Sequence, residues 1–220
     1  MKKAIAAAAL SMLMMFSLAA CSSNENPDST ASNTIEESTA KTAEETAAEA
    51  EAIEKAARLE KKAQEGYDLF FENKYEEAVA AENEVIAEDP TFFKAYYIKG
   101  ITQCYAGNYS EGSKNIDKAL ELNPDDYMAR FNKALSLELY RYYDESLSWY
   151  EKSLEVANGQ GEWSYYGIAS IYGRRGDAAS TVKYLRLAID INPDIREEAK
   201  SESDFDPVRS SKEFTELIGE

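Results

Sequence analysis

The stretch that decides the fold is FKAYYIKGITQCYAGNYSEGSKNIDKALELNPDD, residues 93–126. Gly107 and Asn108 divide it, and a glycine there suits the left-handed cap that ends a helix. The second half carries four residues at helical spacing, Tyr109, Gly112, Ile116 and Ala119. It stops before Pro124, because proline cannot continue a helix. The stretch therefore predicts two helices joined by a short turn, a helical hairpin.

The small residues Gly100 and Gly112 let the two predicted helices approach each other closely, and Tyr96 and Tyr109 fill the space around them. One hairpin of this kind cannot bury its apolar face alone. Several units must therefore stack on one another.

The same pattern recurs along the chain every 34 residues, with one step of 35. Two sets of positions show the period: Gly66, Gly100, Ala134 and Ala169, and then Tyr75, Tyr109, Tyr143 and Ala178. The units close at Asp89-Pro90, Asn123-Pro124, Asn158-Gly159 and Asn192-Pro193. A fixed period of this length indicates a repeat architecture.

The order of aromatic, small, aromatic and small residues followed by proline resembles the tetratricopeptide repeat. The resemblance covers about residues 59–193 and implies an all-α fold, a tetratricopeptide-type α-solenoid of helical hairpins. Another array of helical hairpins is the alternative. We expect four units, at about 59–92, 93–126, 127–161 and 162–193.

The first unit departs from the family's pattern, because Lys62 and Glu82 stand where large apolar residues are usual. This departure predicts an outer capping unit with a solvated face. Residues 43–58 before it begin a segment that is rich in Ala, Glu and Lys and has no Gly or Pro until Gly66. They predict a leading helix that runs into the first repeat helix.

Residues 194–220 predict two short helical stretches broken at Asp206-Pro207. They resemble the tail that follows terminal repeats in one bacterial branch of the family, an acidic-Phe-x-Pro-x-Arg turn and a Glu-Phe-x-x-Leu helix. Four apolar side chains of the tail can cover the edge of the last repeat: Phe205, Val208, Phe214 and Leu217. We therefore expect capping helices at the C-terminus.

Residues 1–20 have the positive start and apolar run of a secretory signal peptide. A membrane-spanning helix is the alternative, although about 17 apolar residues is the lower limit for a span. The run ends in Leu18-Ala19-Ala20-Cys21, which resembles the lipobox of bacterial lipoproteins. The resemblance implies cleavage between Ala20 and Cys21 and lipidation of Cys21 by acyl chains such as palmitate. An ordinary signal peptide with an incidental cysteine is the other possibility.

Two or three acyl chains hold a protein stably on a membrane. We therefore expect the protein on the extracytoplasmic side of the cell membrane, or on the outer membrane if the cell has two membranes. Residues 21–42 begin with Cys21 and continue with Ser, Thr, Asn and Glu and almost no large apolar side chain. Such a segment cannot offset its chain entropy by burial, so we expect a disordered tether.

The chain carries 24 Lys and Arg against 41 Asp and Glu, a formal net charge of −17. Such a charge repels nucleic acid and anionic lipid, which excludes DNA-binding and polybasic membrane-surface roles. The sequence contains no His, which removes imidazole bases and the commonest zinc ligand. We expect no cofactor, no metal and no small-molecule substrate. Cys104, the other cysteine, is either a packing residue or a reactive thiol.

In the tetratricopeptide family, the first helix of each unit lines a concave groove at fixed offsets. The resemblance places ten residues of this chain in a peptide-binding groove: Tyr67, Phe70, Tyr97, Ile101, Tyr105, Phe131, Leu135, Trp163, Tyr166 and Arg174. Other matching positions are Phe71, Lys94, Cys104, Met128, Glu138, Leu139 and Ser170. Tyrosine and tryptophan give a large contact area and can also hydrogen-bond, which suits a bound peptide or helix. The alternative is that many of these rings pack between neighbouring helices.

A subclass of the family grips carboxylate termini with Lys, Arg and Asn residues in the groove. Most matching positions here are aromatic or aliphatic, so we reject that type of ligand. The sequence instead predicts a membrane-anchored scaffold that binds an envelope or secreted protein. A permanent component of an envelope secretion or outer-membrane assembly complex is the alternative.

A carboxylate-dependent hydrolase is a third possibility, because the acidic pairs Asp125-Asp126 and Glu76-Glu77 exist. They fall in a turn and at a helix start, where acidic residues serve as caps and solvated charge. No Gly-rich phosphate loop, nucleophile elbow or metal-ligand motif accompanies them. We therefore do not expect an enzyme.

Overall fold

The computed structural model describes residues 43–219, and in that range the chain forms ten α-helices and one short 3-10 helix, with no strand. The predicted all-α class is confirmed. The predicted signal peptide, the lipidated Cys21 and the tether lie outside the described residues.

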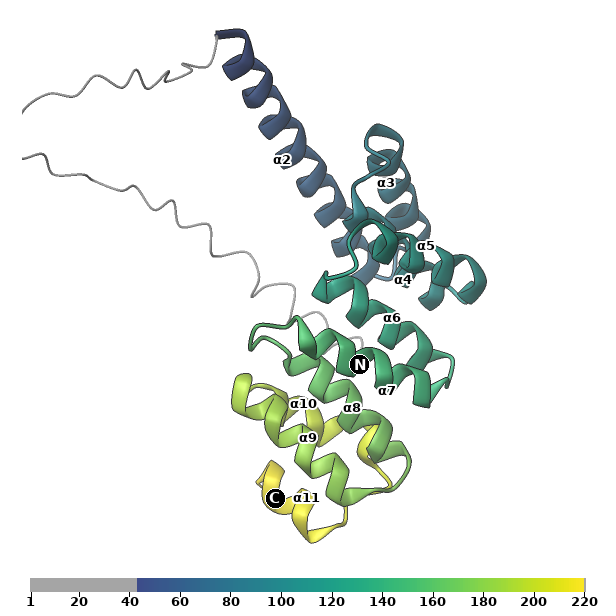
Figure 1. Cartoon of the computed structure of the whole chain (residues 1–220). Coiled ribbons are helices and arrows are strands. Elements are labelled where there is room, and N and C mark those ends of the chain that lie inside the picture. Colours follow the sequence, from purple (N-terminus) through teal and green to yellow (C-terminus); the bar gives the residue numbers. More distant parts are fainter. Residues whose placement is uncertain (1–42, 220) are drawn as a thin grey trace, which may run out of the picture.

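Eight of these helices form four consecutive hairpins. They are α2 (Ala43–Phe71) with α3 (Tyr75–Glu88), α4 (Phe93–Tyr105) with α5 (Tyr109–Leu122), α6 (Tyr127–Leu139) with α7 (Tyr143–Glu155), and α8 (Glu162–Arg174) with α9 (Ala178–Ile191). The first helix of each hairpin contacts the first helix of the next hairpin. The hairpins thus follow one another as the steps of an α-solenoid, as predicted (Figure 1).

Each hairpin turns at one residue with a left-handed backbone. The four residues are Asn73, Gly107, Arg141 and Gly176, with φ of 63°, 91°, 65° and 74°. Glycine adopts this conformation without strain and asparagine tolerates it, whereas an arginine there is strained. The third hairpin therefore closes with a residue that its backbone disfavours.

The second hairpin depends on two glycines that let its helices touch. A Cβ atom on Gly100 would lie 2.7 Å from the carbonyl oxygen of Gly112, and one on Gly112 would lie 2.6 Å from the carbonyl oxygen of Gly100. Both distances are shorter than a Cβ atom tolerates from a backbone oxygen. The small residues therefore bring α4 and α5 together, as the sequence predicts.

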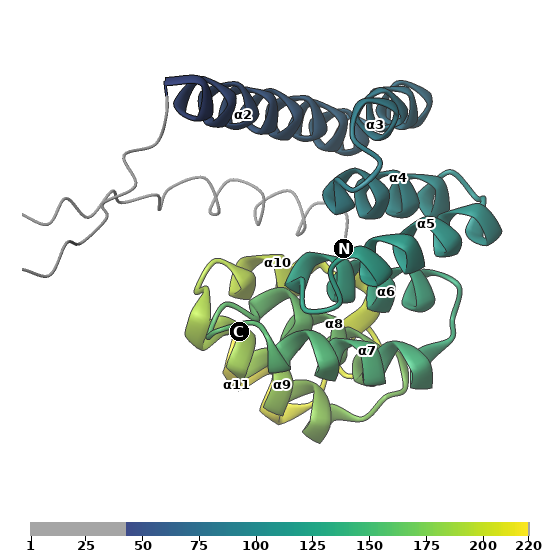
Figure 2. The same ribbon diagram turned by 45° about the horizontal axis from the view of Figure 1, so that its top comes forward.

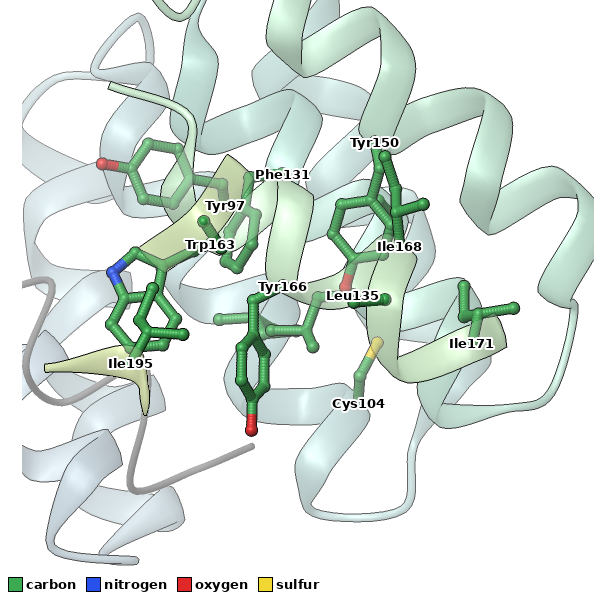
Figure 3. Packing of buried hydrophobic residues seen from close by; sticks show 14 of the residues in the cluster. Tyr97, Cys104, Phe131, Leu135, Tyr150, Trp163, Tyr166, Ile168, Ile171 and Ile195 are labelled. Atoms are coloured by element: carbon green, nitrogen blue, oxygen red, sulfur yellow. The ribbon is translucent and has the colours of Figure 1, made fainter. Parts of the chain in front are cut away.

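Polar contacts join each hairpin to the next. The Tyr140 hydroxyl donates to the carbonyl oxygen of Cys104 at 2.9 Å. The Tyr127 and Ser164 hydroxyl oxygens lie 3.2 Å apart. Apolar side chains continue the contact, since one cluster of buried residues extends from α2 to the C-terminal tail, and Figure 3 shows part of it.

The prediction that the first unit has a solvated face is wrong for Glu82. Its side chain is fully buried, and Gly66 on α2 makes room for it, because a Cβ atom there would lie 3.0 Å from the Glu82 Cδ atom. Lys62 is half-buried and pairs with the carboxylate of Glu84. A glutamate therefore occupies the apolar contact between α2 and α3.

The helix α2 is continuous from Ala43 to Phe71, so the leading segment and the first repeat helix form one element. Its first half extends beyond the rest of the first hairpin (Figures 1 and 2). Arg58 donates to the Glu88 carboxylate at 2.7 Å, at the end of α3. Among residues 43–219, no helix combines the length and the apolar character that crossing a membrane requires.

The tail consists of α10 (Ile195–Ser201), the 3-10 helix η1 (Ser203–Phe205) and α11 (Lys212–Ile218). η1 contacts α8 and α11 contacts α9, so the tail takes the place of a further hairpin. Arg209 closes the bend by donating to the carbonyl oxygen of Glu202 at 2.7 Å. Phe205, Val208 and Phe214 are buried in these contacts, as expected of a cap.

Candidate functional site

The candidate site is the side of the solenoid formed by the first helices, α2, α4, α6 and α8, which we call the inner face. The ten predicted groove residues all lie on these four helices. Their spacing of one repeat brings equivalent side chains close together along the array, because the first helices contact each other.

Most of these residues belong to the core. Eight of the ten are buried, with exposed fractions between 1% and 7%: Tyr67, Phe70, Tyr97, Ile101, Phe131, Leu135, Trp163 and Tyr166. Burial raises the pKa of the Tyr67 and Tyr97 hydroxyls above the usual value. The rings also contact each other across hairpins, as between Phe70 and Tyr105, whose centroids are 5.2 Å apart. In this structure these side chains stabilise the stack (Figure 3).

The accessible part of the inner face lies where the first helices end. Tyr105 is half-buried, the Arg174 side chain is 29% exposed, and Leu139 is 38% exposed. These three residues occupy equivalent positions in successive hairpins. We call them the accessible row.

A buried polar cluster lies beside the accessible row. Arg174 pairs with Asp204 of the tail through two contacts, from Nε at 2.8 Å and from a terminal nitrogen at 2.9 Å. The second carboxyl group near Arg174 is that of Glu138 on α6, whose Oε1 lies 3.8 Å from the same guanidinium group. Two carboxyl groups therefore share one arginine at the junction of α6, α8 and the tail.

Glu138 has no exposed surface. Its Oε2 accepts a hydrogen bond from the Tyr150 hydroxyl at 2.7 Å, whereas Oε1 has no hydrogen-bond partner within the described range. Burial raises the pKa of the Glu138 carboxyl to about 7, against the opposing effects of the Tyr150 hydrogen bond and the Arg174 charge. The protonation of this carboxyl therefore changes near neutral pH.

The sequence pattern placed Glu138 on the groove side but did not reveal the cluster. The spacing of Ser170 and Asp204, which is one repeat, is the signal in the sequence that could have found it. In the structure a hydrogen bond joins these two side chains. The interpretation of the tail as an apolar cap concealed this polar contact.

Two buried hydrogen-bond donors lie on α8, one of the helices of the inner face. The Trp163 Nε1 atom and the Tyr166 hydroxyl have no hydrogen-bond partner in residues 43–219. Buried polar groups normally have partners, so an unpaired donor is unfavourable. The two rings lie 5.9 Å apart in an edge-on arrangement, and Figure 3 shows both side chains.

The remaining chemical candidates have structural roles. The Asp126 side chain caps α6 by accepting from the Ala129 backbone N–H at 2.7 Å, and Asp125 pairs with Arg130 at 2.6 Å. Cys104 is buried, and burial raises the pKa of its thiol to about 12. Over the described residues, no group of His, Cys, Asp and Glu side chains could hold a metal ion.

A family model described as "Tetratricopeptide repeat" matches residues 164–195, which cover nearly all of the fourth hairpin and the turn after it. Residues 164–195 are therefore a tetratricopeptide repeat, and the hairpins before them have the same two-helix architecture.

Two known proteins show similarity to part of this chain. Hsp70-Hsp90 organizing protein 2 of Arabidopsis thaliana is 30% identical over 92 residues, which are 42% of this chain and 16% of that protein. TPR repeat-containing protein MJ1428 of Methanocaldococcus jannaschii is 26% identical over 127 residues, 58% of this chain and 22% of that protein. The matches thus span less than a quarter of these relatives.

Solved tetratricopeptide-type structures agree with the fold. TTC0263 of Thermus thermophilus superposes with a TM-score of 0.60 at 17% identity, covering 73% of this chain and 86% of that one. Pseudomonas aeruginosa PilF gives a TM-score of 0.59 at 13% identity, covering 75% and 77%. Identities this low establish the shared fold and nothing finer.

Proposed function

We propose that this tetratricopeptide-repeat protein is a lipid-anchored scaffold on the extracytoplasmic side of a membrane, where its inner face holds a segment of an envelope or secreted protein. The observation that carries the binding part is the accessible row. Tyr105, Leu139 and Arg174 offer an aromatic ring, an aliphatic side chain and a guanidinium group along one line. Tyrosine and arginine are enriched among the few residues that carry most of the binding energy in protein interfaces.

The repeat architecture supports a protein partner. Stacked hairpins form an extended surface rather than a closed pocket, and an extended surface suits a peptide or a helix. The name of the Arabidopsis relative describes a protein that organises two other proteins, Hsp70 and Hsp90. The match covers 16% of that relative, so the partner of this chain must be found by experiment.

Photo-crosslinking tests the binding surface. A benzoylphenylalanine residue placed at 105 or 139 should crosslink a partner in cells. The same residue at Leu187, which is 37% exposed on α9, is the matched control on a second helix. Equal crosslinking from position 187 would contradict an inner-face site.

Purification in mild detergent separates a transiently binding scaffold from a permanent assembly component, because a stoichiometric complex would favour the permanent component.

The lipid anchor has its own test. The Cys21→Ser variant should lose acyl labelling and leave the membrane fraction, since stable anchoring requires the acyl chains. Cys104→Ser is the matched control and should remain in the membrane, because Cys104 is buried in the repeats. An unchanged membrane fraction for Cys21→Ser would contradict the anchor and leave the inner-face proposal unaffected.

A further inference from the structure

The tail is attached to the inner face of the fourth hairpin by a small set of contacts. Asp204 accepts a hydrogen bond from Ser170 and pairs with Arg174. The backbone oxygen of Asp204 would lie 2.7 Å from a Cβ atom on Gly173, so the glycine admits η1. The Phe205 ring meets the Tyr166 ring edge-on at 5.5 Å. Asp204 is therefore the polar centre of the attachment, and Tyr166 lies beneath it.

The charges at this junction do not balance. Arg174 gives its two shortest contacts to Asp204, donates to the Tyr143 hydroxyl at 3.2 Å, and leaves Glu138 at 3.8 Å. A neutral Glu138 carboxyl does not oppose this arrangement. An ionised Glu138 carboxylate competes for Arg174 and repels Asp204, and burial strengthens both effects.

Titratable and polar groups from four neighbouring elements act on Glu138 or on its partners. The groups are Tyr150 of α7, Ser170 and Arg174 of α8, Asp204 of η1 and Tyr105 of α4. Burial raises the pKa of the Tyr105 and Tyr150 hydroxyls, so both phenols stay neutral at ordinary pH. Glu138 is consequently the group of this cluster that changes charge near neutral pH.

We infer that the tail, residues 194–219, is a pH-sensitive cover of the inner face of α8, held closed through Asp204 while Glu138 is neutral and loosened when Glu138 ionises. The inference rests on the proposed function, because it regulates access to the same inner face. The tail is the element that yields, since it follows the last described hairpin and its main contacts are with α8 and α9.

Loosening the tail changes what the inner face offers. The Phe205 ring leaves Tyr166, whose hydroxyl lacks a hydrogen-bond partner in the described structure. Once uncovered, this hydroxyl can donate to a carbonyl oxygen of a bound segment. Arg174, released from Asp204, pairs instead with the ionised Glu138 carboxylate. The alkaline form therefore presents a longer binding surface than the acidic form.

Hydrogen exchange of the full chain tests the inference without a partner. The reporters are the Val208 and Ser211 amides, which donate within the tail at 3.0 and 2.9 Å. After correction for intrinsic exchange, the opening constant of the tail should rise between pH 6 and pH 8. The rise approaches about tenfold if the pKa of Glu138 falls from about 7 in the closed form to 4.5 in the open form.

Three variants make the test specific. Glu138→Gln should reduce the pH-dependent rise to less than about twofold. Asp204→Asn should increase tail exchange already at pH 6, because it weakens the contact with Arg174. Asp144→Asn removes the exposed pair with Arg175 and should change neither value. A flat pH response in the parent, or an unchanged response in Glu138→Gln, would overturn the inference.

The result of the hydrogen-exchange test does not depend on whether photo-crosslinking captures a partner. If Glu138→Gln does not fold, the parent's pH response and the Asp204→Asn variant still decide the matter. A pH-dependent tail with no crosslinked partner would contradict the proposed function alone. A crosslinked partner with a tail that ignores pH would contradict the cover alone.

Discussion

Replacing Glu82 by leucine should stabilise the first hairpin, most strongly at alkaline pH. Both oxygens of the buried Glu82 carboxyl lack a hydrogen-bond partner within the described residues. Burial raises the pKa of this carboxyl from 4.5 to about 9. Leucine has a similar size and suits the buried part of the contact between α2 and α3, where Ala63, Ala78 and Val85 are buried.

The magnitude follows from proton linkage. A carboxyl whose pKa is higher in the folded state stabilises the fold fully below 4.5, and this contribution is lost as the pH rises towards 9. The loss is about 1.4 kcal/mol per pH unit, hence at most about 4 kcal/mol between pH 5 and pH 8. We expect Glu82→Leu to raise the free energy of unfolding by about 2 to 4 kcal/mol at pH 8, and by less at pH 5.

Urea unfolding followed by circular dichroism at pH 5 and pH 8 measures this difference. Repeat arrays do not always unfold in one step, so hydrogen exchange of α3 amides supplies the local stability of the first hairpin. Glu84→Gln is the control, since it removes only the surface pair with Lys62 and should cost less than about 1 kcal/mol. A destabilised Glu82→Leu variant, or one with the parent's pH dependence, would refute the reasoning.

Two further substitutions and one thiol-reactivity measurement test the fold. Arg141→Gly should raise the free energy of unfolding by about 1 kcal/mol, because glycine relieves the left-handed strain, while Asn73→Gly should change it less. Gly100→Ala should lower it by about 1 to 3 kcal/mol in thermal or urea unfolding, because the added Cβ atom meets the Gly112 carbonyl oxygen. In a Cys21→Ser background, Cys104 should react with a thiol reagent at pH 8 only after unfolding, because its pKa is about 12 and it is buried.

The hairpins could be predicted because their signals are local. Gly107 ends α4 with a left-handed backbone, and the Asn108 side chain accepts from the Glu111 backbone N–H to begin α5. The repeat period then placed every later helix on the same pattern. Neither inference required knowledge of contacts between distant residues.

The depth of burial could not be predicted in the same way. The repeat offsets placed Leu135 and Leu139 on one side of α6, yet Leu135 is 1% exposed and Leu139 is 38% exposed. The difference depends on how closely neighbouring helices and the tail approach, which no single repeat encodes. For the same reason, Glu82 was expected in solvent although Gly66, on the facing helix, makes room for it in the core.

Glu82 and Glu138, two buried carboxyls with raised pKa values, lie in different hairpins of the described array, and this position determines their effect. Glu82 lies in the first hairpin, and Glu138 lies where the third and fourth hairpins meet the tail. In a linear array, each hairpin is stabilised only by itself and its neighbours, so a local charge loosens its own neighbourhood and leaves the remainder folded. Alkaline pH should therefore loosen the first hairpin and the tail while α5 and its contacts with α4 persist, and the order of amide exchange along the chain measures this directly.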